Sequence, residues 1–244
     1  MIEIDKKRLC VVGDIHGELN TLVYNISERF DFKDTAFIIA GDIGLGFEKR
    51  GYYEALYNRN KERLEKRGNI IYGIRGNHDD NCGYFKAETK IDFPRFKTIP
   101  DYEPLCWENK IILPIGGANS VDKKIRLEEN KKWEEKGSTK RCWWPDERPE
   151  HLETFDSLPR HVDIVISHEA PMSCGPILIR ESWMDSEMYE NIKEDRYYLY
   201  KILREMTPER WYFGHHHNSY SGTCGGTMYK GLDIHEIIEV IYYD

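Results

Sequence analysis

The stretch Gly13-Asp14-Ile15-His16-Gly17 decides how the rest of the chain is interpreted. It directly follows Leu9-Cys10-Val11-Val12, an apolar run with the length of a buried strand. In an extended chain, Asp14 and His16 at positions i and i+2 point to the same face. The flanking glycines allow a sharp turn with little side-chain bulk. The sequence therefore places a carboxylate and an imidazole at the carboxyl end of a strand, where open α/β sheets bind their ligands.

Two further predicted strands end in the same kind of sequence. The apolar run 35–40 leads into Gly41-Asp42-Ile43-Gly44, and the run 69–74 leads into Gly76-Asn77-His78-Asp79. Between the three strands, apolar residues recur at helical spacing over 18–30, and 51–67 is a charged stretch that we also expect to be helical. This alternation predicts βαβ connections and parallel strands. Three successive strands thus end in a potential ligand beside glycine.

The C-terminal half contributes two more strand ends. A buried-strand pattern at 162–166 ends in Ser167-His168-Glu169, and after a predicted long helix at 187–206 a short strand ends in Gly214-His215-His216-His217. His216 lies between two ligand candidates and would point away from them in an extended backbone, which favours a structural role. The alternating remainder predicts closing antiparallel strands. Together, the strand-end candidates are Asp14, His16, Asp42, Asn77, His168, His215 and His217.

The middle of the chain has a different character. We expect a hairpin over 104–113 that turns near Glu108-Asn109-Lys110. From 123 to 160 the sequence is polar, mixed in charge and interrupted by prolines, but it holds three tryptophans, Trp133, Trp143 and Trp144. We interpret residues 1–244 as a single domain with an elaborated insertion at about 118–160. Tryptophans can stack on nucleobases, but we favour the alternative that they anchor the insertion to the core.

Composition limits the classes of function. The formal net charge of −8 disfavours a general nucleic-acid coat, because such binding relies on Lys and Arg. No apolar run approaches the roughly 20 residues that span a bilayer, and the first residues lack the apolar core of a signal peptide. The six cysteines are scattered without a Cys-x-x-Cys pair. We therefore expect a cytoplasmic protein with no membrane partner and with free thiols.

The donor types point to metal chemistry. The candidates offer nitrogen and oxygen without thiolate, a set that suits Mn, Fe, Zn or Ni better than a soft metal or Ca. Seven ligands are too many for one tetrahedral site, but they suit two metals that share a bridging carboxylate.

The ordered set Gly-Asp-x-His, Gly-Asp, Gly-Asn-His-Asp, a late His and Gly-His-x-His resembles the calcineurin-like metallophosphoesterase superfamily. The motifs run from Gly13 to His217, nearly the whole chain. The resemblance implies an α/β fold of two packed mixed β-sheets flanked by helices. It implies two divalent or trivalent metal ions per chain, Mn foremost, with Fe, Zn or Ni as alternatives. By motif position, Asp14, His16 and His217 would hold the first metal, Asp42 would bridge, and Asn77, His168 and His215 would hold the second.

The resemblance also implies a reaction. A metal-dependent phosphoesterase of this kind hydrolyses phosphomonoesters or phosphodiesters, with a phosphorylated small molecule or a nucleotide as substrate. Two cations about 3.5 to 4 Å apart lower the pKa of a bridging water, which generates hydroxide for in-line attack on phosphorus. Asp42, as the bridging carboxylate, and His78, as general acid or phosphate ligand, would be the catalytic residues. Asn77 and His78 would contact the substrate.

One branch of the superfamily fits less well. The phosphoprotein phosphatases continue the second motif as Gly-Asp-x-Val-Asp-Arg-Gly and place Glu after Gly-Asn-His. Here Gly41-Asp42-Ile43-Gly44 lacks that continuation, and Asp79 follows His78. The residues therefore disfavour a Ser/Thr protein phosphatase and leave the orienting partner of His78 open.

A narrower resemblance lies in the insertion. Gly116-Gly117-Ala118-Asn119-Ser120-Val121-Asp122, then Arg126, Trp143-Trp144-Pro145 and Glu147, are similar to a branch of bacterial and phage metallophosphoesterases. That branch includes the phosphatase module of bacterial polynucleotide kinase-phosphatases. The similarity implies that Arg126 binds phosphate, a task that suits its bidentate guanidinium.

Two alternatives stay open. A nuclease of the same superfamily would share the motifs, although the acidity and the lack of a basic stripe disfavour nucleic acid. A catalytically silent interaction scaffold would share the fold but could lose its ligands. The aromatic tail Ile241-Tyr242-Tyr243 could complete a sheet or pair with another subunit. The sequence leaves the oligomeric state and the native substrate undetermined.

Overall fold

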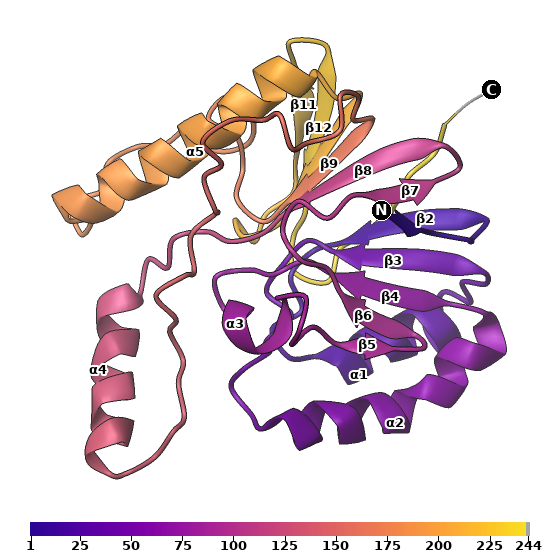
Figure 1. The fold of residues 1–244 in the computed structure, drawn as a ribbon, viewed down its shortest axis with the longest axis horizontal. Helices are drawn as coiled ribbons and strands as arrows, with labels where there is room; N and C mark the ends of the chain where they lie inside the picture. Colours follow the sequence, from indigo (N-terminus) through magenta and orange to yellow (C-terminus); the bar gives the residue numbers. More distant parts are fainter. Residues whose placement is uncertain (243–244) are drawn as a thin grey trace.

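The computed structural model describes residues 1–242 and consists of two mixed β-sheets flanked by helices (Figure 1), which confirms the expected sandwich. In sheet order, the six-stranded sheet is β13 (Ile237–Glu239), β2 (Arg8–Val12), β3 (Thr35–Ile39), β4 (Ile70–Gly73), β6 (Phe96–Thr98) and β5 (Asp92–Phe93). The seven-stranded sheet is β1 (Ile2–Glu3), β7 (Leu105–Trp107), β8 (Lys110–Ile115), β9 (Ile164–Ser167), β10 (Arg210–Phe213), β12 (Thr227–Gly231) and β11 (Tyr220–Cys224).

The central strands are apolar throughout because both of their faces are buried. In β2, Leu9 and Val11 pack between the two sheets, against residues such as Ile164 and Tyr212 of the other sheet. The alternate residue Cys10 points to the outer face, where it belongs to the same buried cluster as the first helices. This double burial explains the uninterrupted runs by which the strands were predicted.

Helices cover the outer faces of both sheets (Figure 1). On the six-stranded sheet lie α1 (Leu19–Tyr24), which continues into a π-helical turn, η1 (Asn25–Arg29), and α2 (Arg50–Arg67). On the seven-stranded sheet lies α5 (Ser186–Met206). A short helix, α3 (Asn81–Tyr84), follows β4. The helices predicted at 18–30, 51–67 and 187–206 are thus confirmed within a few residues.

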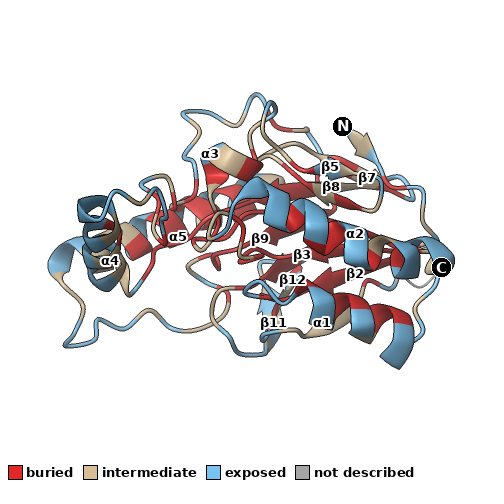
Figure 2. Cartoon of the chain, turned by 90° about the horizontal axis from the view of Figure 1, so that it is seen from below, coloured by how far each residue is buried: buried red, intermediate tan, exposed pale blue. Residues whose placement is uncertain are grey.

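The insertion contains a helix that the sequence did not predict, α4 (Lys123–Glu135). It lies away from the sheets and is mostly exposed (Figure 2), and Asn130 is its one buried residue. A helix that buries so little needs no apolar stripe, so its sequence lacks the helical period. Asn130 ties the returning chain to α4: its Nδ2 donates to the Trp143 carbonyl at 2.9 Å, and its Oδ1 accepts from the Cys142 N–H at 2.8 Å.

The predicted hairpin and the predicted closing strand are both present in the structure. The hairpin of β7 and β8 pairs Trp107 with Lys110 across Glu108 and Asn109. Strand β13 closes the six-stranded sheet by antiparallel pairing with β2. Of the aromatic tail, Tyr242 packs against the layer between the sheets, whereas Tyr243 lies outside the described residues. Within residues 1–242, no helix is long and apolar enough to cross a membrane.

Candidate metal centre

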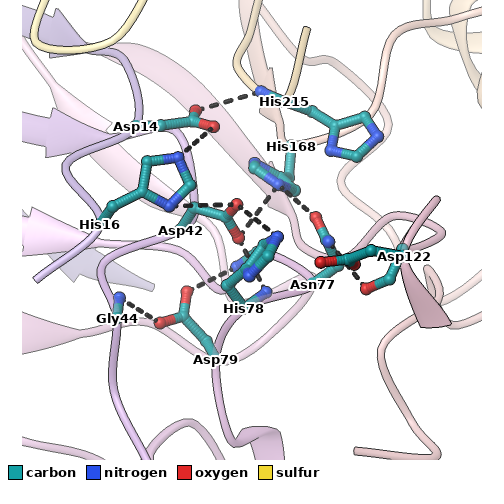
Figure 3. Close-up of polar contacts among 12 residues, drawn as sticks. Asp14, His16, Asp42, Gly44, Asn77, His78, Asp79, Asp122, His168 and His215 are labelled. Carbon is teal, nitrogen blue, oxygen red and sulfur yellow. Dashed lines mark hydrogen bonds and ion pairs between the residues drawn. The ribbon is translucent and has the colours of Figure 1, made fainter. Parts of the chain in front are cut away.

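The strand ends that carry the seven ligand candidates converge at one end of the sandwich. Strands β2, β3 and β4 pair in parallel in one sheet, and β9 and β10 pair in parallel in the other. Their carboxyl ends meet, so that side chains from both sheets point toward one another (Figure 3).

One group of candidates lies tightly together. Single ligand atoms of Asp14, His16, Asp42 and His217 all lie within 4.8 Å of one another. The Nε2 atom of His217 is 3.0 Å from Asp14 Oδ2 and 3.0 Å from the Nε2 of His16. Two imidazole nitrogens and a carboxylate oxygen that converge in this way can hold a transition-metal cation.

A second group adjoins the first through Asp42. His168 Nε2 is 3.0 Å from Asn77 Oδ1 and 3.3 Å from Asp42 Oδ1. The other ring nitrogen, Nδ1, donates to the Ala40 carbonyl at 2.8 Å, which directs Nε2 into the centre. The ring of His215 lies beside that of His168, with 5.0 Å between centroids. The structure thus brings all seven candidates together, in two groups that share Asp42.

Asp42 is the residue on which both groups depend. It is almost fully buried, and its Oδ1 accepts a hydrogen bond from the His78 N–H at 2.8 Å. Its Oδ2 is buried and has no hydrogen-bond partner within residues 1–242; it lies 3.9 Å from His16 Nδ1 and 3.7 Å from His78 Nε2. A buried carboxylate oxygen without a partner is costly, and a cation bound between the two groups would satisfy it. The donor set and this oxygen therefore fit divalent or trivalent metal ions.

Electrostatics favours the ionised form of this carboxylate. Burial would raise the pKa of Asp42, but the imidazoles of His168 and His78 outweigh it and hold that pKa well below the usual range. Burial likewise opposes protonation of His168, yet the charges of Asp42 and Asp14 raise its pKa to about 10. Burial lowers the pKa of His215 to about 3, which keeps this ring neutral. Cation binding would displace the His168 proton and take over its charge.

The backbone is strained at four of the candidates. His16, Asp42, His215 and His217 have φ angles of 43°, 47°, 65° and 46°, in the left-handed region that non-glycine residues rarely adopt. Such strain clusters at functional sites. Strand β2 ends at Val12, so a turn, and not the extended strand expected from the sequence, brings His16 Nε2 to 3.8 Å from Asp14 Oδ2.

Two glycines beside the ligands are required by close contacts. A Cβ at Gly41 would lie 2.2 Å from His168 Nδ1, and one at Gly76 would lie 2.0 Å from Asp42 Oδ1. The glycines that accompany the motifs thus make room for the ligands.

His78 lies at the edge of the centre and meets a residue from the insertion. The Arg126 Nη2 atom is 3.5 Å from His78 Nε2, while Arg126 Nε donates to Asp122 at 2.7 Å and Nη1 to the Cys142 carbonyl at 2.9 Å. Burial lowers the pKa of His78. Arg126, in the first turn of α4, therefore places its guanidinium beside the site that was predicted from the strand ends.

Sequence reasoning missed two supporting carboxylates. Asp79 accepts hydrogen bonds from the N–H groups of Gly76 and of the loop after β3. Glu169 accepts from His216 Nε2 at 2.8 Å, and its Oε2 lies 3.8 Å from His215 Nε2. His216 is thus tied to a neighbour of the ligands. The sequence did offer one indication of their role: Asp79 and Glu169 each directly follow a histidine of the motifs.

Comparisons with known proteins give the family. A family model described as calcineurin-like phosphoesterase matches residues 7–219. TT1561 of Thermus thermophilus has a similar structure, with a TM-score of 0.51 and 9% identity, over 96% of this chain and 98% of that one. The phosphopantetheinyl hydrolase PptH from Mycobacterium tuberculosis aligns with a TM-score of 0.46 and 12% identity, over 95% and 91% of the two chains.

At these identities the likeness to solved structures concerns the fold alone. A search of curated proteins finds no match to this chain. The family assignment therefore stands on the family model, which spans the strands that carry the ligand candidates, the candidate centre and the insertion. The chain belongs to the calcineurin-like phosphoesterase family.

Proposed function

We propose that this protein is a metal-dependent phosphoesterase that hydrolyses phosphomonoesters or phosphodiesters with two metal ions. The observation that carries the proposal is the buried carboxylate of Asp42: its Oδ1 lies 3.3 Å from His168 of the second group, and its Oδ2 lies 3.9 Å from His16 of the first group and has no hydrogen-bond partner among residues 1–242. A carboxylate held in this way by residues of both sheets is suited to bridge two cations.

The proposed ligands follow from the two groups. Asp14, His16 and His217 would hold the first ion, Asn77, His168 and His215 the second, and Asp42 both. When bound, such a pair lowers the pKa of a water and stabilises charge on the phosphoryl oxygens. Mn is our first choice, with Fe, Zn or Ni as alternatives, because the donors are imidazole, carboxylate and amide oxygen.

Two side chains outside the ligand set would act on the substrate. His78 is near Asp42 but belongs to neither group, so it is free to donate a proton to the leaving oxygen or to bind a phosphoryl oxygen. Arg126 offers its guanidinium beside that ring, where it would bind the phosphate. Asn77, which belongs to the second ligand group, is held in place because its Nδ2 donates to Ser120 Oγ at 2.9 Å.

The acidic surroundings weigh against the nuclease alternative. Of the described residues that line the cavity at the centre, Arg126 is the one with a lysine or arginine side chain, and it pairs with Asp122. Glu48 adds a further carboxylate to the wall. A phosphorylated small molecule or a nucleotide suits such a wall better than a nucleic-acid strand.

The first test is metal content together with turnover. Protein purified without chelator should contain about two metal ions per chain, and p-nitrophenyl phosphate hydrolysis should disappear on EDTA treatment and return with Mn²⁺. Asp42→Asn should lose both metal and activity. Folded wild-type protein that binds no metal and shows no metal-dependent turnover would overturn the proposal and favour the scaffold alternative.

A further inference from the structure

The cavity at the metal centre continues into an apolar compartment. Its volume is about 800 Å³, and beyond the ligand candidates it is lined by side chains from the first two helices and the six-stranded sheet. The apolar lining includes Leu19 of α1, Leu56 of α2, Phe96 of β6 and Leu45 of the loop after β3. In the arm of the cavity formed by this apolar lining, these four side chains are nearly fully buried and present little surface. The aromatic surface that a substrate could contact comes from the partly buried Phe47 and the exposed Tyr52.

Apart from the ligand candidates, His78, His216, Asp122 and Arg126, the polar side chains that line the cavity are Glu48, Tyr52 and Tyr53. Tyr53 lines it, but its hydroxyl is already engaged: it accepts from the Gly46 N–H at 2.8 Å and donates to the Gly44 carbonyl at 3.0 Å. A leaving group with several hydroxyls or charges would lose hydrogen bonds to water on entry and would find few groups to replace them. An apolar group would instead gain by leaving water.

Aromatic side chains form the part of the arm nearest the insertion. Phe47 lines the cavity, and the buried Trp144 packs edge to face against its ring, with centroids 5.4 Å apart. Trp144 comes from the insertion, which therefore holds one wall of the arm in place. Aromatic walls fixed in this way favour a flat, ring-containing group.

We propose that the substrate is a phosphate ester whose leaving group is apolar and ring-containing, with the ring in this arm and the phosphate at the metal centre. This inference rests on the proposed function for its site and goes beyond it by naming the leaving group. A second anionic group is disfavoured, since Glu48 and Asp122 line the same cavity and Arg126, the one lysine or arginine among its described lining residues, is assigned to the phosphate itself.

The test compares two monoesters of similar intrinsic reactivity, ethyl phosphate and 2-phenylethyl phosphate. Their alcohols have similar acidity, so a difference in kcat/KM reports how the enzyme binds the ring. We expect the phenylethyl ester to be favoured at least about tenfold, a fraction of what full burial of a phenyl ring can yield. Phe47→Ala should reduce this ratio several-fold, whereas Tyr197→Ala, an exposed tyrosine on α5 outside the cavity, should leave it unchanged.

A binding measurement separates this inference from the proposed function. Calorimetry on Mn²⁺-loaded protein would compare ethylphosphonate with 2-phenylethylphosphonate, neither of which can be hydrolysed at an ester bond. Tighter binding of the phenyl compound supports the inference even if no ester is turned over, a result that would overturn only the proposed function. Equal affinity for the two phosphonates, or equal kcat/KM for the two esters, would overturn the inference.

Discussion

The carboxylate of Asp79 accepts a hydrogen bond from the Gly44 N–H at 2.8 Å and thereby joins the loop after β4 to the loop after β3. The same carboxylate accepts from Ile43, Leu45 and Gly76, so its two oxygens take four backbone N–H groups. The acid after His78 thus fixes the backbone around Asp42, while the ring of His78 faces Arg126.

Asp79→Asn should lower stability by about 2 to 4 kcal/mol, because its amide NH₂ would face buried N–H donors that the carboxylate now satisfies. Urea denaturation of the two proteins gives the difference. The control is Glu54→Gln, an acid-to-amide change at an exposed position on α2. An Asp79→Asn variant as stable as the wild type would show that the four hydrogen bonds do not matter to folding.

His78→Ala should lower kcat by roughly 10² to 10⁴, the range for loss of a general acid. Metal content should stay near that of the wild type, because His78 belongs to neither ligand group. The matched control is His161→Ala, a largely exposed histidine far along the chain. Loss of metal in the His78 variant would mean that the ring is a ligand, contrary to its assigned role.

Arg126→Lys should raise KM about tenfold with a smaller effect on kcat. Lysine keeps the positive charge, but it cannot hold Asp122 and Cys142 while also presenting a planar fork to phosphate. Steady-state kinetics with p-nitrophenyl phosphate measures the change, and Arg141→Lys, at an exposed position of the same insertion, is the control. Unchanged KM would remove Arg126 from the substrate site.

The sequence predicted the strand ends well because the signal there is local. Strands buried on both faces are continuous apolar runs, and the ligand candidates follow them within a few residues, as with Val12 and Asp14. The contacts that support the ligands are not local. Asp79 meets N–H groups 34 to 36 residues earlier, and Trp144 meets Phe47 from the far side of the insertion.

Neither helix α4 nor the left-handed backbone at the ligand candidates could be predicted from local apolar patterns. An exposed helix has no apolar stripe to reveal it. A strained φ at His215 or His217 is imposed by the surrounding fold, not by the preference of histidine itself. An extended backbone therefore predicts a set of side chains that the structure does bring together, but it predicts the wrong local geometry for them.

Glu169 supplies the last prediction. Its buried carboxylate accepts from His216 at 2.8 Å and from the Ala170 N–H at 2.7 Å, and it lies 3.8 Å from His215. Burial would raise its pKa, but the charge and hydrogen bond of His216, together with the charge of Arg196, outweigh this and lower it, so Glu169 is a carboxylate. In the proposed centre, a carboxylate 3.8 Å from His215 Nε2 would favour metal binding through the other ring nitrogen, Nδ1.

Glu169→Gln keeps the size of the side chain but removes the negative charge that lies 3.8 Å from His215 Nε2. Metal affinity at the second position should fall about 10- to 100-fold, the usual effect of losing such a supporting partner. Titration of metal-free protein with Mn²⁺ should then show one ion bound nearly as in the wild type and one bound more weakly. Glu187→Gln, on the exposed first turn of α5, should leave both affinities unchanged. Equal weakening of both ions in the Glu169 variant would contradict a role confined to His215 and would indicate a general loosening of the centre.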